Sequence, residues 1–230
     1  MIESKASQQE LPGIQLVRSK RKSLAITIEA GQVIVRAPLR LPKSEIQAFI
    51  LKKEAWILRT VKAQSEQLAE VPQRQYIDGE YLPWRGRSLC LRLKPGKRIT
   101  ERIGDELYTA IAEKSQLEER VQAWYRKEAK LVLTQKVERL AAAHGLKFAE
   151  VKVRKSKRRW GHCTSKAVLQ FNWLIMLAPE SVINYLVAHE VAHLRHFNHG
   201  PEFWRLVQCF EPGYQQAQAW LKENGHLLVL

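Results

Sequence analysis

Short apolar runs near the amino end of the chain predict a small β-structure. Segment 14–17 is apolar, and segments 24–28 and 32–36 flank a turn at Ala30-Gly31. Two such runs on either side of a glycine-containing turn are typical of a β-hairpin. Residues 1–13 are polar, and we expect them to form a flexible N-terminus.

A helical pattern follows the hairpin and then gives way to β-structure again. Pro42 and Ser44 are suited to open a helix that continues to about Glu70. Its candidate core positions are Ile46, Phe49, Ile50, Trp56 and Ile57. Residues 76–112 contain short apolar runs separated by turn residues, which favours strands. We therefore expect residues 14–112 to be a β-rich N-terminal region with one long helix.

The second half of the chain predicts one long helix, two strands and three shorter helices. Ser115 and Glu118 have the spacing of a capping box, and Gly145 is suited to end the helix that they begin. Its candidate buried positions are Leu117, Val121, Trp124, Leu131 and Val132. The further elements expected are strands at 151–154 and 167–176, and helices at 179–197, 201–208 and 214–223.

The segment His189-Glu190-Val191-Ala192-His193 is the clearest chemical signal in the chain. Two histidines four positions apart lie on one face of a helix, about one turn apart, and can reach the same metal ion. The glutamate between them is placed to polarise a water molecule, as in zinc hydrolases with the H-E-x-x-H motif. The surrounding helix is apolar almost all round and should be buried, so its polar side chains need partners.

A catalytic zinc commonly takes three protein ligands, so a third is needed. His199 lies six residues after His193, the metzincin spacing, but His196 stands where that pattern has glycine, and no methionine follows. Asn198 and Gly200 tolerate left-handed conformations and are candidates for the turn. We favour His199 as the third ligand. The rival candidates are Glu202, Glu211 and Glu223, whereas His196 is expected to lie at the surface or behind a ligand.

Charge and cysteine content bound the setting of the protein. The chain has 230 residues and a net charge of +15, spread along its length, which favours anionic partners, including nucleic acid. An ordinary basic surface explains the charge equally well. Three widely spaced cysteines form no disulfide framework, and neither a signal peptide nor a transmembrane segment is visible. We expect a cytoplasmic protein that does not associate with membranes.

The segment 152–159 carries six cationic residues in eight and precedes the strand that leads to the H-E-x-x-H helix. Arg159 could hold a phosphate or carboxylate at the rim of the site. A solvated loop anchored by Trp160 is the equal alternative. We expect His162 and Cys163, which follow, to be a partly exposed histidine and a packed cysteine rather than ligands.

The chain resembles the YgjP-like metal-dependent hydrolases, which are similar to the SprT and WLM groups of zincins. The N-terminal pattern around residues 21–38 fits this family. The sharper matches are Arg159-Trp160-Gly161-x-Cys163, Leu169-Gln-Phe-Asn172, Tyr185-x-x-x-His189-Glu190-x-x-His193 and Asn198-His199-Gly200-x-x-Phe203-Trp204. The chain departs from the family at His162, where serine is common.

The resemblance implies an α+β fold with a zincin-like core, in which the H-E-x-x-H helix packs on a small β-sheet within residues 113–230. It also implies a hydrolase with a three-histidine metal site. Zn²⁺ is the expected cofactor, although other divalent transition metals also fit. The expected general base is Glu190, acting on a metal-activated water molecule.

The substrate stays open between three alternatives. For a metallopeptidase, Asn172 and the edge of the 167–176 strand could position an extended peptide, and Arg159 could bind it. For a metal-dependent nucleotide phosphohydrolase or pyrophosphatase, the basic segment 152–159 would hold phosphates. The third alternative is a nucleic-acid-associated, SprT-like protease.

Overall fold

The structure, a computed structural model, describes residues 13–29, 31–156 and 158–230. The predicted flexible N-terminus lies outside these residues except for Gly13, as does Ala30 of the predicted turn. The chain divides between Val71 and Pro72 into two compact units. We call them the N-terminal unit and the C-terminal unit and describe each by itself.

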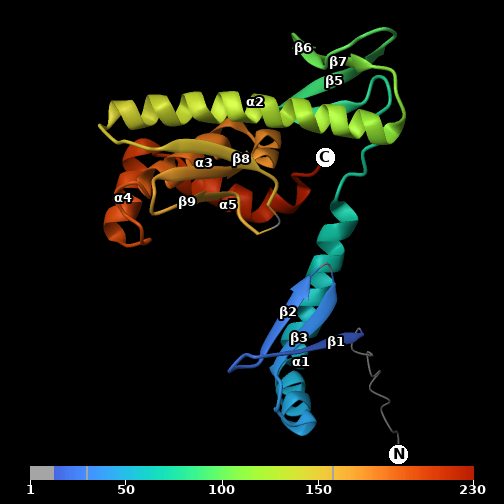
Figure 1. The fold of residues 1–230 in the computed structure, drawn as a ribbon, viewed down its shortest axis with the longest axis vertical. Helices are drawn as coiled ribbons and strands as arrows, with labels where there is room; N and C mark the ends of the chain where they lie inside the picture. Colours follow the sequence, from blue (N-terminus) through green and yellow to red (C-terminus); the bar gives the residue numbers. More distant parts are fainter. Residues whose placement is uncertain (1–12, 30, 157) are drawn as a thin grey trace, which may run out of the picture. The chain divides into compact units, whose positions relative to one another are not determined.

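The N-terminal unit contains a three-stranded sheet and one long helix (Figure 1). Strands β2 (Ala25–Glu29) and β3 (Gln32–Pro38) form the predicted antiparallel hairpin, and β1 (Ile14–Ser19) pairs in parallel with β3. Helix α1 (Lys43–Glu70) confirms the predicted helix. Its buried residues Ile46 and Ile57 contact the apolar side of β3. The prediction of Trp56 as a core residue was wrong, because its side chain is 42% exposed.

The predicted β-rich segment after α1 forms a four-stranded sheet in the order β4-β5-β7-β6. Its strands are β4 (Tyr81–Trp84), β5 (Arg87–Lys94), β6 (Glu101–Ile103) and β7 (Glu106–Ala110). The apolar side chains of this sheet share one core with helix α2 (Lys114–Ala143), and the Tyr125 hydroxyl donates a hydrogen bond to the Pro83 carbonyl at 2.7 Å. The unit boundary therefore lies before this sheet, whereas the sequence pattern predicted a boundary at residues 112–113.

Helix α2 confirms the predicted long helix but not its predicted cap. The residue before its first turn is Glu113, and no side chain caps the helix, so Ser115 lies inside the first turn. Leu131 was predicted to be buried but is 52% exposed. Leu133 is buried instead, together with other positions spaced four apart: Leu117, Val121, Tyr125, Ala129, Val137 and Ala141.

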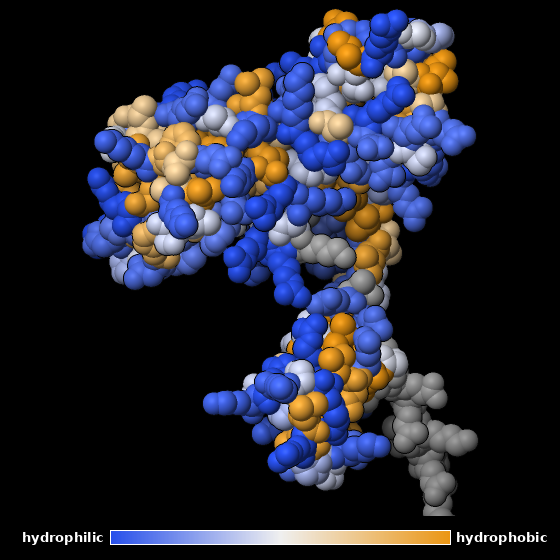
Figure 2. Space-filling model, in the orientation of Figure 1, coloured by the Kyte–Doolittle hydropathy of each residue, from blue (hydrophilic) through white to orange (hydrophobic). Residues whose placement is uncertain are grey.

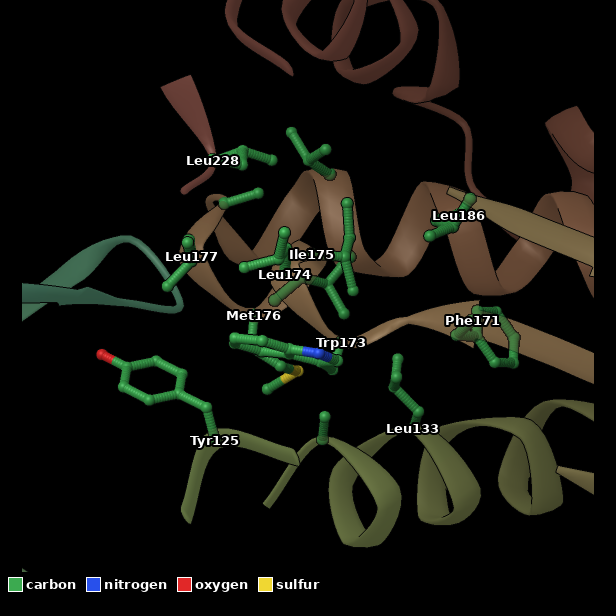
Figure 3. Close-up of a cluster of buried hydrophobic side chains, with 14 of the residues drawn as sticks. Tyr125, Leu133, Phe171, Trp173, Leu174, Ile175, Met176, Leu177, Leu186 and Leu228 are labelled. Carbon is green, nitrogen blue, oxygen red and sulfur yellow. The ribbon is translucent and has the colours of Figure 1, made fainter. Parts of the chain in front are cut away.

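The C-terminal unit contains a second sheet, which has three strands. Its order is β8-β10-β9, with β10 (Val168–Asn172) parallel to β8 (Glu150–Arg154) and antiparallel to β9 (Gly161–Cys163). The predicted strand at 167–176 ends early, because the Asn172 side chain accepts a hydrogen bond from the Leu174 N–H and starts a 3₁₀ turn, η1 (Trp173–Leu177). Figure 3 shows Trp173 and Met176 of this turn in the core with Tyr125 and Leu133 of α2.

Three helices complete the C-terminal unit: α3 (Glu180–Ala192), α4 (Pro201–Phe210) and α5 (Tyr214–Asn224), followed by the 3₁₀ turn η2 (Gly225–Leu227). Figure 1 shows α3 between α2 on one side and α4 and α5 on the other. Helix α3 is shorter than the predicted helix at 179–197, and Pro179 precedes its first turn. The observed architecture is α+β, as predicted.

An ion-pair cluster holds the start of α3. Arg85 donates two hydrogen bonds, at 2.8 and 2.9 Å, to the carboxylate of Glu180, and Lys136 lies 2.5 Å from the same carboxylate. The hydrogen bonds from Arg85, with those from Lys136, lower the pKa of Glu180 to about 2. The cluster ties the turn between β4 and β5, and helix α2, to the helix that carries the H-E-x-x-H motif.

On the face shown in Figure 2, much of the surface of the C-terminal unit is hydrophilic, in keeping with the many charged residues of the chain. Within the described residues, no helix is both long enough and apolar enough to span a membrane.

Candidate active site

Three histidines converge where α3 ends. His189 lies in the last turn of α3, His193 is the residue that caps it, and His199 lies just before α4. Each can offer a ring nitrogen such that all three nitrogens lie within 4.8 Å of one another. The Nε2 atoms of His189 and His199 are 3.1 Å apart. The two histidines of the motif and the favoured third histidine are therefore brought together.

The chain reaches His199 by ending α3 early rather than by a left-handed turn. The N–H groups of Leu194 and Arg195 bond to carbonyls three residues back, which closes the last turn. Asn198 and Gly200 were candidates for this turn because they tolerate left-handed conformations, but neither has a positive φ. Gly200 is extended, with φ −74° and ψ 178°, and Pro201 then starts α4.

A backbone carbonyl fixes the ring of His193. Its Nδ1 lies 2.9 Å from the carbonyl oxygen of His196. A carbonyl can only accept, so Nδ1 carries the proton and Nε2 keeps its lone pair. This is the arrangement that orients metal-ligating histidines in proteins. His196 thus acts behind a candidate ligand through its main chain, in line with its predicted place.

Burial favours the neutral form of the His189 and His193 rings. Burial, followed by repulsion from His193 and His199, lowers the pKa of His189 to about 3. Burial also lowers the pKa of His193. Metals bind neutral imidazole, and the buried Nδ1 of His189 has no hydrogen-bond partner among the described residues. The donor set therefore fits a transition metal such as zinc.

Two aromatic residues of α4 pack against the histidines. The Phe203 ring centroid lies 4.5 Å from that of His193 and 4.8 Å from that of His199. Trp204 stacks on His199 with ring centroids 5.8 Å apart. These rings limit how far the imidazoles can rotate and exclude water from one side of the group. The sequence pattern contained both residues but did not predict this contact.

Glu190 is buried beside the histidines. Its side chain is 3% exposed, and its Oε2 atom has no hydrogen-bond partner among the described residues. Burial raises the pKa of Glu190 to about 8. A buried carboxyl oxygen without a hydrogen-bond partner is costly to a fold, and carboxyl groups with shifted pKa values concentrate at functional sites.

The backbone of Gly161 makes room for Glu190. A Cβ atom on Gly161 would lie 2.2 Å from Oε1, 2.6 Å from Cδ and 2.7 Å from Cγ of Glu190. Real Cβ atoms do not approach other atoms so closely, so any side chain at this position would force strand β9 or the Glu190 side chain to shift. Sequence reasoning gave Gly161 no role, although it lies within the Arg159-Trp160-Gly161 motif.

The rival ligands lie elsewhere. Among the described residues, no carboxylate or thiol joins the three histidines. Glu202 instead pairs with Arg205 at 2.8 Å. Cys163 is buried and directs its thiol to the Thr164 carbonyl, and His162 is exposed on β9, as expected for both.

Arg159 and Asn172, the two candidates for substrate binding, have different surroundings. Arg159 is exposed at the end of the loop that precedes β9. Asn172 is 3% exposed, and its side chain donates to the Ser156 carbonyl at 2.9 Å while accepting from Leu174. Within the described chain, the polar atoms of Asn172 are thus occupied by the protein itself.

An α+β fold with three convergent histidines and an adjacent buried glutamate belongs with the metal-dependent hydrolases. The family comparison identifies the group: the model described as YgjP-like, metallopeptidase domain matches residues 22–224. The chain belongs to this family. No curated protein matches it.

Solved structures give a partial likeness. The metallopeptidase zymogen abylysin of Pyrococcus abyssi is 19% identical with a TM-score of 0.36, and the match covers 40% of this chain and 93% of that chain. The metallopeptidase zymogen jannalysin of Methanocaldococcus jannaschii is 13% identical with a TM-score of 0.36, covering 40% of this chain and 94% of that chain.

Proposed function

We propose that this protein is a zinc-dependent peptidase with a zincin-like core in its C-terminal unit. The proposed metal ligands are His189, His193 and His199, and the proposed general base is Glu190. The observation that carries the proposal is the convergence of the three ring nitrogens within 4.8 Å next to the buried carboxyl group of Glu190, whose Oε2 atom has no hydrogen-bond partner in the described part of the chain. Three imidazole nitrogens favour zinc over the hard cations Mg²⁺ and Ca²⁺, which prefer oxygen ligands.

A zinc ion at this position would supply a Lewis acid that polarises the scissile carbonyl and acidifies a water molecule. The chain supplies the proton transfer. The charge of a bound zinc ion would favour the ionised form of the Glu190 carboxyl group, which would then take the proton from the attacking water and pass it to the leaving nitrogen. Gly161 and the apolar surroundings hold the carboxyl group in one place, which spares the site reorganisation during the reaction.

The strand that presents the peptide would be β9 rather than β10. We had expected the edge of the 167–176 strand, but β10 pairs on both sides, with β8 and with β9. β9 is the edge strand nearest to Glu190, and an extended peptide could add to it by backbone hydrogen bonds. Asn172 would then act indirectly, by holding the 156–160 loop that leads into β9.

The test is to replace Glu190 with Gln and to assay zinc-loaded protein on a fluorogenic peptide library. We expect the variant to bind one zinc ion and to lose peptide hydrolysis by about 1,000-fold, within the range of general-base effects. Glu202→Gln is the matched control, because Glu202 lies close to the site in sequence but pairs with Arg205 at the surface. Full activity of Glu190→Gln would refute the assigned base.

Nucleotide hydrolysis is the second candidate. It is favoured by Arg158 and Arg159 in the loop before β9, since arginines bind phosphates. The same preparations should be given nucleoside triphosphates. The proposed peptidase releases no phosphate from them, and zinc-dependent phosphate release without peptide cleavage would replace the peptidase by a phosphohydrolase.

A further inference from the structure

A cavity of about 490 Å³ lies between the loop before β9 and helix α5. Trp160 forms one wall, and its indole lies 3.3 Å from the position of a Cβ atom on Gly225, so the ring rests on the backbone there. The lining residues used below come from the same loop, α3 and α5: Arg158, Arg159, Tyr185, Gln218, Leu221 and Lys222.

The lining of this cavity is cationic. Arg158, Arg159 and Lys222 contribute three permanent positive charges, and no carboxylate is among the described lining residues. Within the described part of the chain, Arg159 and Lys222 form no ion pair. A concave surface with one sign of charge concentrates ligands of the opposite sign.

The cavity adjoins the three-histidine group through Tyr185, which lines the cavity and packs against His189. Tyr185 lies one helical turn before His189 on α3, and their ring centroids are 5.9 Å apart. Gln218 of α5 lines the cavity together with Tyr185. On the other wall, Trp160 directly precedes Gly161, the residue against which Glu190 packs.

A peptide on the β9 edge would therefore pass the cavity. An extended chain advances about 3.4 Å per residue, so a side chain in the cavity would belong to a residue about two to four positions from the scissile bond. Apolar contact with Trp160 and Leu221 suits the methylene groups of such a side chain, while the cations suit its end.

We propose that this cavity selects peptides with a carboxylate close to the scissile bond, through Arg159 and Lys222. The inference rests on the proposed peptidase function and names its substrate class. The carboxylate can belong to an aspartate or glutamate side chain or to the peptide C-terminus, and the two sources differ in whether amidation of the terminus removes the preference.

The test compares peptide pairs that differ only by Glu against the isosteric Gln, placed in turn at each position within four residues of the cleaved bond, with free and amidated termini. For the wild type we expect kcat/KM about tenfold higher with Glu at one of these positions. The Glu/Gln ratio should fall to about 1 in the double variant Arg159→Gln, Lys222→Gln. Lys127→Gln, an exposed lysine of α2 outside the cavity, should keep the wild-type ratio.

Binding to zinc-loaded Glu190→Gln, measured by calorimetry with the same pairs, reads the cavity without turnover. Equal affinity for all Glu and Gln peptides and equal affinity for free and amidated ones would overturn the proposal, as would a preference that survives the double variant. Cleavage of neutral and acidic peptides at equal rates would refute the role of the cavity but not the peptidase function. If acidic peptides bind preferentially but the wild type does not cleave them, the peptidase function is refuted and carboxylate binding in the cavity is supported.

Discussion

The contact between Gly161 and Glu190 allows a prediction that separates catalysis from metal binding. A methyl group added by Gly161→Ala would lie 2.2 Å from Oε1 of Glu190. Non-bonded atoms keep about 3.5 Å, so the carboxyl group or β9 must move by about 1 Å. Gly161 has no positive φ, so the substitution strains no backbone conformation, and its effect is steric.

A displacement of about 1 Å at a reacting group can cost about 100-fold in rate. We expect Gly161→Ala to lose about 100-fold in kcat/KM on peptides and about 1–3 kcal/mol in the free energy of unfolding through overpacking. The three atoms nearest to the new methyl group all belong to Glu190 and none to a histidine, so zinc affinity should stay within about threefold of the wild type, read by competition with a chromophoric chelator.

Gly213→Ala is the matched control, because its added Cβ would meet only Glu211 Oε1, at the ordinary distance of 3.8 Å. It should keep both activity and zinc affinity. Wild-type activity in Gly161→Ala would refute the view that this glycine holds Glu190 in its working position. Loss of zinc together with activity would show that the substitution disrupts the whole site.

Four further outcomes are expected. His199→Ala should weaken zinc binding by about 100-fold or more in chelator competition, whereas His196→Ala should change it by less than about threefold, because only the His196 carbonyl is used. Zinc at about 100 times its Kd should raise the free energy of unfolding by about 2.7 kcal/mol, and denaturation of apo and zinc-loaded protein measures this. The lowered pKa of Glu180 stabilises the fold above pH 4.5 and less so as pH falls toward 2. Since Glu180 is partly exposed, Glu180→Gln should cost about 1 kcal/mol at pH 7, with the difference from wild type shrinking between pH 4.5 and 2 in denaturation of the apo protein. Leu133→Ala should lower stability by about 2–5 kcal/mol and Leu131→Ala by less than about 0.5 kcal/mol, in urea unfolding.

Most elements could be predicted from the sequence, because apolar periodicity follows secondary structure directly. The errors occur where one side chain overrides the pattern. Asn172 ends β10 by capping a 3₁₀ turn, although the apolar run continues into Trp173. The burial of Leu133 in place of Leu131 depends on which face of α2 meets the two sheets, and this is decided by tertiary packing.

The candidate site could be predicted as far as its local spacing reached. His189, Glu190 and His193 follow from helical geometry, and His199 follows from its distance along the chain. The role of Gly161 and the cavity lined by Lys222 could not be predicted, because β9 and α5 meet α3 only through long-range packing. The burial of Glu190 depends on the same contacts.

X-ray absorption at the zinc edge of the zinc-loaded wild-type protein tests the central claim most directly. The account predicts one zinc ion with three imidazole nitrogens at about 2.0–2.1 Å, and the loss of one imidazole in His199→Ala. A sulfur ligand at about 2.3 Å, which would point to Cys163, or an unchanged imidazole count in His199→Ala would contradict it.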